Sequence, residues 1–301
     1  MAKFVLLAPT GQVGFELSRA LAPIGDVVAI GRQNIDFSNL ETLSAMIKTI
    51  SPDVIVNAAA YTMVDKAETD QEQAFLINEQ LPLVLAKIAN EKNALLVHYS
   101  TDYVYPGDGD SPWVESDKTT PLSVYGQSKL AGDCAIIEHC KKYLIFRTSW
   151  VYASRGNNFM KTMMKLAQSR DMLNVVNDQF GAPTPARLIA QVSALAIQKM
   201  LQKNDDMDKL SGVYHLAPTG FTNWYGFADE IFALARKANI ELMLKAENFK
   251  GISTEKYPTP AKRPKNSRLD ITKLETTFGL VMPSWQSQLQ LTFAEWLEYQ
   301  K

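Results

Sequence analysis

The sequence is poor in the residues that form disulfides and bind metals. Only two of its 301 residues are cysteines, Cys134 and Cys140. They fall six positions apart in a predicted helix and point to different faces, which argues against a disulfide between them. Only three histidines are present, far apart in the chain, so no metal cluster is predicted. We expect two reduced thiols in a cytoplasmic protein.

Strong net charge and long apolar runs are also lacking. The formal net charge is -1, so no overall attraction to nucleic acid or to an anionic membrane is expected. No window approaches the roughly 18 apolar residues that a membrane span needs. The short apolar N-terminus leads to Gly11 and Gly14 and not to a signal-peptide cleavage site. The sequence therefore predicts neither a nucleic-acid partner nor a membrane partner.

The first half of the chain alternates short apolar runs with longer amphipathic stretches. The apolar runs lack polar alternation, which is typical of parallel strands buried on both faces. Their repeated alternation with helices predicts right-handed crossovers in an α/β fold with a Rossmann-like, doubly wound parallel sheet. The predicted strands are residues 4–8, 27–30, 54–57, 95–99 and 144–147, and the predicted helices are 11–21, 39–50, 71–89 and 125–139.

The alternation weakens after about residue 150. Prolines and Gly181 interrupt the chain at 181–185, and we predict a helix over 186–201, a strand over 212–216 and a proline-rich basic loop over 254–268. These pieces predict a smaller C-terminal substrate-binding lobe. The predicted Rossmann domain comprises residues 1–152 plus about 185–220, and the predicted lobe comprises 153–184 and 221–301.

A glycine-containing turn follows the first predicted strand. Gly11, Gln12 and Val13 lie where a tight turn and a helix start would direct backbone N–H groups at a pyrophosphate. Gly11 would allow close approach of the phosphates, and Gly14 would let the helix pack against the sheet. Ala8 occupies the place of the first glycine of the dinucleotide fingerprint, so a purely structural turn is the alternative.

The end of the second predicted strand indicates which dinucleotide is bound. An enzyme that selects NAD usually has Asp or Glu here to hold the ribose 2′-hydroxyl. Gly31 removes that carboxylate, and the Arg32 guanidinium suits a 2′-phosphate. We therefore predict NADPH, with NADH as the alternative. Asp36 is expected to accept a hydrogen bond from the adenine amino group or to cap a helix. The other predicted cofactor contacts are Phe37, Ala60, Tyr61, Thr62, Tyr99, Tyr125 and Lys129.

The predicted catalytic residues are Tyr125, Lys129 and Thr101. Tyr125 and Lys129 are four residues apart and share one helix face. A lysine ammonium is expected to lower the pKa of the tyrosine phenol, which is ordinarily about 10. Thr101 ends the fourth predicted strand and can donate a hydrogen bond to a substrate carbonyl. A Tyr–Lys pair alone is also typical of a solvated helix face, and the dinucleotide turn favours catalysis.

Together these motifs resemble the extended short-chain dehydrogenase/reductase family, and within it the nucleotide-sugar reductases. The resemblance runs nearly from end to end. It rests on TGQVG at 10–14, NAAA at 57–60, DKAE at 65–68, STDYV at 100–104, YG at 125–126, KLAG at 129–132, RTSWVY at 147–152, NNF at 157–159, DQ at 178–179, GAPT at 181–184, RP at 263–264 and NSRL at 266–269.

The resemblance implies NADPH-dependent reduction of the C4 ketone of dTDP-4-dehydro-6-deoxy-L-mannose to dTDP-L-rhamnose. It implies Tyr125 as the acid that protonates the reduced oxygen, assisted by Lys129 and Thr101. It also implies substrate contacts at Thr101, Asp102 and Trp150. Some relatives are magnesium-linked dimers. No carboxylate cluster in this sequence demands the metal, so Mg²⁺ and a homodimer both stay open.

Two further features are candidates for the substrate side. The Trp150 indole can cover a sugar ring, and a core tryptophan is the alternative. The loop containing Arg263 and Arg268 is basic in a chain of near-zero charge. Because a nucleotide sugar carries a diphosphate, these two arginines are predicted to bind it. Solvated surface charge is the alternative.

Three rival functions follow from the same residues. A dehydratase or epimerase would need an Asp-Glu pair after the strand-end threonine, and here the pair is Asp102-Tyr103. A non-catalytic cofactor-binding subunit would be expected to have lost catalytic residues, yet Thr101, Tyr125 and Lys129 are present. Another 4-keto-sugar reductase that makes the epimeric product is not distinguished by the sequence.

The cofactor prediction can be tested through Arg32. Arg32→Ala removes the guanidinium proposed for the 2′-phosphate, so it should raise the Michaelis constant for NADPH more than that for NADH. Steady-state kinetics with both cofactors measures this difference. Equal changes in the two Michaelis constants would show that Arg32 does not bind the 2′-phosphate.

Overall fold

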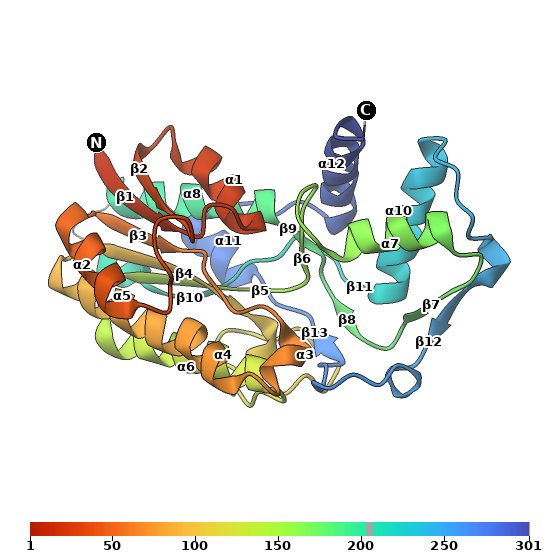
Figure 1. The fold of residues 1–301 in the computed structure, drawn as a ribbon, viewed down its shortest axis with the longest axis horizontal. Helices are drawn as coiled ribbons and strands as arrows, with labels where there is room; N and C mark the ends of the chain where they lie inside the picture. Colours follow the sequence, from red (N-terminus) through yellow and green to blue (C-terminus); the bar gives the residue numbers. More distant parts are fainter. Residues whose placement is uncertain (203–206, 301) are drawn as a thin grey trace.

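The computed structural model describes residues 1–202 and 207–300. Residues 203–206 and 301, which belong to the predicted Rossmann and lobe ranges, lie outside the described residues. The described chain forms a larger part built on a twisted sheet and a smaller, mainly helical part beside it (Figure 1).

The larger part is organised around six strands in the order β10-β5-β4-β3-β1-β2. Every neighbouring pair is parallel, so the predicted Rossmann-like α/β sheet is confirmed. From β1 the chain passes to β2 on one side and then to β3 on the other, so the direction of the connections reverses at β1. Ligands bind such sheets at the carboxyl ends of the strands near this point. The strands are β1 (Ala2–Leu7), β2 (Gly25–Ile30), β3 (Val54–Asn57), β4 (Leu95–Thr101), β5 (Tyr143–Thr148) and β10 (Gly212–His215).

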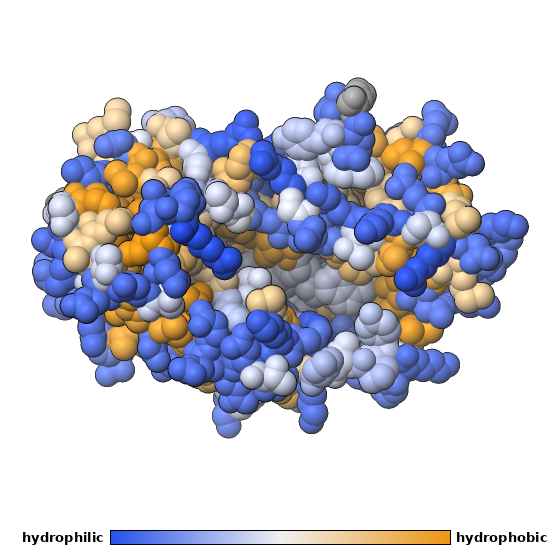
Figure 2. Space-filling view, in the orientation of Figure 1, coloured by the Kyte–Doolittle hydropathy of each residue, from blue (hydrophilic) through white to orange (hydrophobic). Residues whose placement is uncertain are grey.

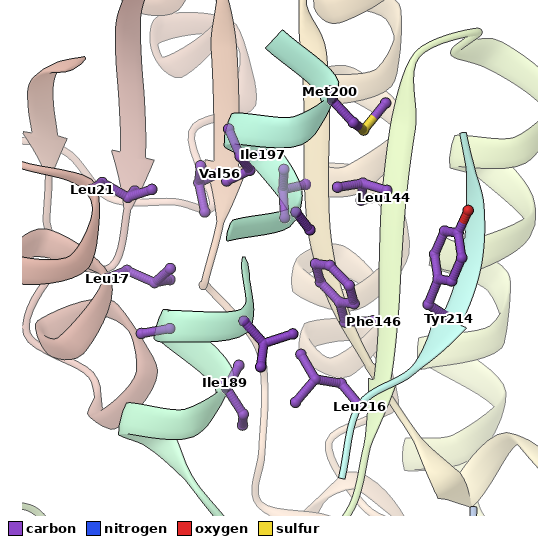
Figure 3. Packing of buried hydrophobic residues seen from close by; sticks show 14 of the residues in the cluster. Leu17, Leu21, Val56, Leu144, Phe146, Ile189, Ile197, Met200, Tyr214 and Leu216 are labelled. Atoms are coloured by element: carbon purple, nitrogen blue, oxygen red, sulfur yellow. The ribbon is translucent and has the colours of Figure 1, made fainter. Parts of the chain in front are cut away.

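Helices cover both faces of the sheet, which explains why its strands lack polar alternation. Phe4 and Leu6 of β1 pack on one face with α1, α8 and α11, and Val5 and Leu7 pack on the other with α2, α5 and α6. Figure 3 shows the first face, where side chains of α1 and α8 meet those of the strands. These helices are α1 (Gln12–Leu21), α2 (Leu40–Ile50), α5 (Leu81–Glu91), α6 (Val124–His139), α8 (Ala186–Gln202) and α11 (Thr272–Phe278).

The predicted helix over 71–89 differs from the structure in its middle. It consists of α4 (Gln71–Phe75), a π-helical turn η1 (Leu76–Gln80) and α5. Pro82 has no N–H to donate to the carbonyl of Asn78, which removes one ordinary helical hydrogen bond at this place. The wider turn directs Asn78 into the interior, where it is fully buried. Such turns often occur at functional sites.

The smaller part has a core of its own. Met160 of α7, Phe227 of α10 and Leu289 of α12 lie in one apolar cluster, beside short strands that form two- and three-stranded sheets. Its helices are α7 (Phe159–Ser169), α10 (Trp224–Lys237) and α12 (Trp285–Glu298), and the remaining strands are β6 (Val151–Tyr152), β7 (Leu173–Val176), β8 (Phe180–Gly181), β9 (Thr184–Pro185), β11 (Thr222–Asn223), β12 (Phe249–Ile252) and β13 (Asn266–Ser267).

One helix within the predicted lobe range packs on the Rossmann core. Leu274 and Phe278 of α11 belong to the cluster that covers the first face of the sheet. The predicted lobe boundaries themselves stay a prediction. Short helical segments complete the described chain: α3 (Val64–Ala67), η2 (Asp102–Val104), α9 (Met207–Leu210), η4 (Ala246–Asn248) and η5 (Thr254–Lys256).

A hollow separates the two parts on the face seen in Figure 2. The carboxyl ends of the central strands are directed toward it (Figure 1), so residues that follow these strands gather beside it.

Both cysteines are free. Cys134 lies in α6, and Cys140 is the residue that directly follows this helix, so the two do not share one helix as predicted. Within residues 1–202 and 207–300, no helix is long and apolar enough to cross a bilayer.

The packing of α1 on the sheet can be tested at Gly14. A Cβ atom at Gly14 would collide with the backbone carbonyl of Ala8, whereas one at Gly11 would lie 3.5 Å from the same oxygen, an ordinary contact. Gly14→Ala should therefore lower the free energy of unfolding by about 1–3 kcal/mol or more. The matched control Gly11→Ala should cost less than about 1 kcal/mol. Denaturant unfolding without cofactor measures both, and equal losses would contradict the packing argument.

Candidate active site

The turn between β1 and α1 presents unpaired helix-end amides. Ala8 has φ +57, in the left-handed region that favours glycine, although it replaces the first fingerprint glycine. That backbone costs a residue with a Cβ roughly 1–2 kcal/mol. Gly11 caps α1 without any side-chain hydrogen bond to the first amides of the helix. The N–H groups around Gln12 and Val13 therefore suit a pyrophosphate.

The same turn is tied to the smaller part of the molecule. Asn158 caps α7 by accepting a hydrogen bond from the Lys161 N–H. Its side-chain amide also donates to Gln12 Oε1 at 2.9 Å and to the Ala153 carbonyl at 2.7 Å. The cofactor turn and the loop that enters α7 therefore hold each other in place.

The residues after β2 form a compact turn. The Gly31 N–H donates to Asn34 Oδ1 at 2.9 Å, and Arg32 is exposed. Asp36 Oδ1 accepts from the Ser38 N–H at 3.0 Å, and hydrogen bonds from Ser38 hold the pKa of Asp36 below its usual value. Phe37 is buried beneath the turn. Arg32 and Asp36 are thus near neighbours at the carboxyl edge of the sheet.

After β3, the side chain of Asn78 fixes the backbone at Tyr61. Asn78 Oδ1 accepts from the Tyr61 N–H at 2.9 Å, and its amide group donates to the Tyr61 carbonyl at 3.1 Å and to Ser128 Oγ at 3.0 Å. The Tyr61 hydroxyl donates to Asp70 at 3.0 Å. Ala60 is half-buried and Thr62 is exposed. The predicted contacts at 60–62 are therefore held in place by a residue that the sequence analysis missed.

Thr101 and Tyr125 meet at the end of β4. Thr101 Oγ1 accepts from the Tyr103 N–H at 3.2 Å and lies close enough to the Tyr125 hydroxyl to lower its pKa. Ser123 caps α6, with Oγ accepting from the Gly126 N–H at 3.2 Å, which places Tyr125 in the first turn. The two hydroxyls that the sequence singled out are thus brought together.

The prediction that Lys129 lowers the pKa of the Tyr125 phenol was wrong. Burial raises the pKa of Tyr125 well above its usual value, although the Thr101 hydroxyl partly offsets this. The Lys129 amine is instead bound to β4, donating to the Tyr99 carbonyl at 2.6 Å, with Nζ 3.1 Å from His98 Nε2. The phenol therefore stays protonated over the neutral range.

Lys129 is almost completely buried, with 1% of its surface exposed. This burial lowers its pKa to about 8, while the nearby Asp133 carboxylate acts in the opposite direction. Tyr99 contributes to the site through its carbonyl, because its hydroxyl donates to Ser193 Oγ at 2.8 Å. A partly deprotonated lysine at neutral pH can exchange a proton with its surroundings.

Asp102 lies beside Thr101 and is also buried. Burial raises its pKa to about 6, and the nearby hydroxyls of Ser267 and Thr101 lower it. Its Oδ1 accepts from Thr101 Oγ1 at 3.1 Å. Its Oδ2 has no hydrogen-bond partner in the described part of the chain. A buried unpaired carboxylate oxygen is costly and suits an incoming donor.

Trp150 stacks on a second tryptophan that the sequence analysis missed. The ring centroids of Trp150 and Trp224 are 3.7 Å apart and nearly parallel, at 14°. Trp150 has φ +49, and its indole lies so close to Gly181 that a Cβ there would be 2.8 Å from the ring. The Trp224 ring nitrogen donates to Gln179 Oε1 at 3.1 Å. Two indoles from the two parts of the molecule are thus joined near the hollow.

The two candidate arginines have different surroundings. Arg263 donates to Asp65 Oδ2 at 2.7 Å and to the Tyr103 hydroxyl at 3.2 Å. It lines a pocket of about 570 Å³ formed by loops around residues 106–109 and 254–265, which includes none of the three predicted catalytic residues. Arg268 lies over the Phe180 ring, 4.5 Å from its centroid. Within residues 1–202 and 207–300, neither arginine forms a hydrogen bond or ion pair with Tyr125 or Lys129.

Comparison with known proteins identifies the family. The model of the RmlD substrate binding domain matches residues 2–297. The dTDP-4-dehydrorhamnose reductase of Escherichia coli K12 is 53% identical over 286 residues, covering 94% of each chain. The chain belongs to the RmlD family.

Solved structures agree with this RmlD assignment. A dTDP-4-dehydrorhamnose reductase from Clostridium acetobutylicum has a TM-score of 0.88 at 34% identity, covering 98% of this chain and 99% of that one. The enzyme from Bacillus anthracis, solved in complex with NADP, has a TM-score of 0.86 at 34% identity with the same coverage. In the described part of this RmlD chain, no group of three His, Cys, Asp or Glu residues is placed to hold a metal ion.

The role of Asn78 in this RmlD chain can be tested by a change of one atom. Asn78→Asp puts an oxygen against the Tyr61 carbonyl in place of a donor, so we expect the free energy of unfolding to fall by about 2–4 kcal/mol. NADPH affinity should fall as residues 60–62 lose their anchor. The exposed Asn90→Asp is the matched control and should change neither. Unfolding and NADPH fluorescence titrations measure these effects, and an unchanged Asn78→Asp protein would show that the anchor is dispensable.

Proposed function

We propose that this chain reduces the C4 ketone of dTDP-4-dehydrorhamnose with NADPH to give dTDP-L-rhamnose, the last step of dTDP-rhamnose synthesis. The observation that carries the proposal is the 53% identity to a dTDP-4-dehydrorhamnose reductase over 94% of both chains. The nearness of the Thr101 hydroxyl to that of Tyr125, which lowers the Tyr125 pKa, supports the same chemistry. The chain is thus an oxidoreductase acting on a nucleotide sugar.

NADPH supplies the hydride when it is bound. The uncapped start of α1 fits its pyrophosphate, and exposed Arg32 at the end of β2 fits the 2′-phosphate. A relative of this family was solved with NADP. Gly11, Gln12 and Val13 would hold the phosphates, and Ala60, Tyr61 and Thr62 would line the path of the cofactor along the sheet edge.

Tyr125 supplies the proton. As hydride reaches C4, negative charge develops on the ketone oxygen, and a hydroxyl within hydrogen-bond reach can protonate it. The raised pKa of Tyr125 keeps that hydroxyl protonated before the reaction. Thr101 would donate to the same oxygen and orient it, once its hydroxyl has turned away from Asp102 Oδ1. Lys129, whose pKa burial lowers to about 8, would return a proton to the phenolate.

The remaining predicted residues would hold the sugar nucleotide. Asp102 Oδ2 suits a sugar hydroxyl, because no protein group in the described chain occupies it. Because the Trp150 indole already stacks on Trp224 and packs on Gly181, only its exposed part would contact the apolar face of the sugar ring. Arg268 and Arg263 would face the diphosphate, which for Arg263 requires sharing its guanidinium with Asp65. A homodimer stays a prediction.

The test is to supply dTDP-4-dehydrorhamnose with NADPH, follow the loss of NADPH absorbance and identify the sugar produced. Tyr125→Phe should reduce turnover by about 100-fold or more while NADPH binding is kept, because general acid catalysis contributes at least that much. Tyr143→Phe, which removes the same hydroxyl at the start of β5 and so at the opposite end of the sheet, is the matched control and should keep most turnover.

Two outcomes would contradict the proposal. No NADPH consumption by the wild-type protein would remove the assigned reaction, and full activity of Tyr125→Phe would remove the assigned acid. A product epimeric to rhamnose would keep the chemistry and change the sugar.

A further inference from the structure

A chain of three buried polar side chains leads from β3 to Lys129. Asn57 ends β3, His98 lies in β4, and both are 1% exposed, as is Lys129. Asn57 Nδ2 lies 3.1 Å from His98 Nδ1, and His98 Nε2 lies 3.1 Å from Lys129 Nζ. None of the catalytic steps above uses Asn57 or His98.

The orientation of the Asn57 amide is fixed by the backbone. Asn57 Oδ1 accepts a hydrogen bond from the Ala59 N–H at 3.1 Å. If the amide turned over, its NH₂ group would face that N–H, and two donors would oppose each other. The NH₂ group of Asn57 therefore faces His98 and donates to Nδ1.

This donation fixes the tautomer of His98. Burial holds the pKa of His98 well below its usual value, and the Lys129 charge lowers it further, so the ring is neutral and carries one proton. Because Nδ1 accepts from Asn57, the proton is on Nε2 and is directed at Lys129 Nζ.

A proton on His98 Nε2 matches a neutral lysine amine and opposes a charged one. The neutral amine has a lone pair that can accept from Nε2 while it donates to the Tyr99 carbonyl. The ammonium ion has only donors. It would meet the Nε2 proton, or would force the ring into the other tautomer, whose Nδ1 proton would oppose the NH₂ group of Asn57.

We propose that Asn57 and His98 are positioning residues that disfavour the ammonium form of Lys129, and so make it easier for Lys129 to pass its proton to Tyr125. The second half of this statement rests on the proposed function. Burial also disfavours the ammonium form, but the other side chains around Lys129 do not. Asp133, one turn later on α6 and paired with Arg147 of β5, favours the charged form, and Tyr125, one turn earlier, is neutral.

Asn57→Asp reverses the direction of the hydrogen bond between residue 57 and His98 Nδ1. A carboxylate can accept both from the Ala59 N–H and from a proton on His98 Nδ1, which leaves Nε2 free to accept from a charged Lys129. We expect the pKa of Lys129 to rise by about one unit or more, a tenfold gain in proton affinity. NMR titration of ¹³Cε-labelled lysine measures it directly, with the signal assigned by its loss in Lys129→Met.

The double variant Asn57→Asp/His98→Leu distinguishes an effect transmitted through the His98 ring from direct attraction between the new carboxylate and the Lys129 ammonium. It keeps the carboxylate and removes the ring, so most of the rise in pKa should disappear. An unchanged Lys129 pKa in Asn57→Asp, or an equal rise in the double variant, would overturn the proposal. If neither variant folds, the wild-type protein decides. Above the Lys129 pKa of about 8, where the amine is neutral, the ¹⁵N shifts of His98 must show the Nε2–H tautomer, and the Nδ1–H tautomer would refute the proposal.

The pH profile of turnover tests the catalytic half separately. Activity that needs a charged Lys129 is present below its pKa and is lost as the pH rises through it. The alkaline limb should therefore move upward in Asn57→Asp by the shift that NMR reports, and move back in the double variant. The Lys129 pKa could shift while the alkaline limb of the pH profile stays in place. This result would support the effect of Asn57 and His98 on Lys129 and would contradict the role of Lys129 in the proposed function.

Discussion

The placement of α6 depends on a buried ion pair with the sheet. Arg147 of β5 donates to Asp133 of α6 at 3.1 Å, and their side chains are 5% and 0% exposed. Arg147 also donates to the Tyr105 hydroxyl at 2.8 Å, which lies 2.7 Å from His215 Nε2 of β10. Removing one partner of such a pair leaves a buried charge and typically costs roughly 3–5 kcal/mol. Because Tyr125 and Lys129 lie on the same helix, their distance from the sheet is set by this pair.

The apolar pattern was sufficient to predict most of the fold. All six strands of the central sheet and the helices α1, α2, α6 and α8 lie within a few residues of their predicted ranges. Strands buried on both faces leave a strong signal in sequence, because most residues in them are apolar. The π-helical turn at 76–80 was not predicted, since its cause is the single missing N–H of Pro82 within an otherwise regular helical pattern.

The site was only partly predictable, because a sequence pattern does not show which polar groups meet. The position of Thr101 at the carboxyl edge follows from the parallel strands, and that of Tyr125 from the start of the next helix. His98 had a weak signal, as an imidazole within an apolar strand run, but its neighbours Asn57 and Lys129 come from other elements. Asn78 and Trp224 lie on helices whose patterns indicate only burial. The raised pKa of Tyr125 depends on how deeply the helix start is enclosed, which spacing alone cannot give.

The Rossmann core is completed by residues from late in the chain. β10 pairs with β5 at residues 212–215, and Leu274, Phe278 and Met282 join the apolar cluster that begins with Phe4. Contacts of such sequence separation form slowly, because a long loop must close before they can be made. During synthesis, the cofactor-binding half therefore cannot finish its core when its own first 150 residues have left the ribosome. It must wait in a partly open state until the smaller part has been made as well.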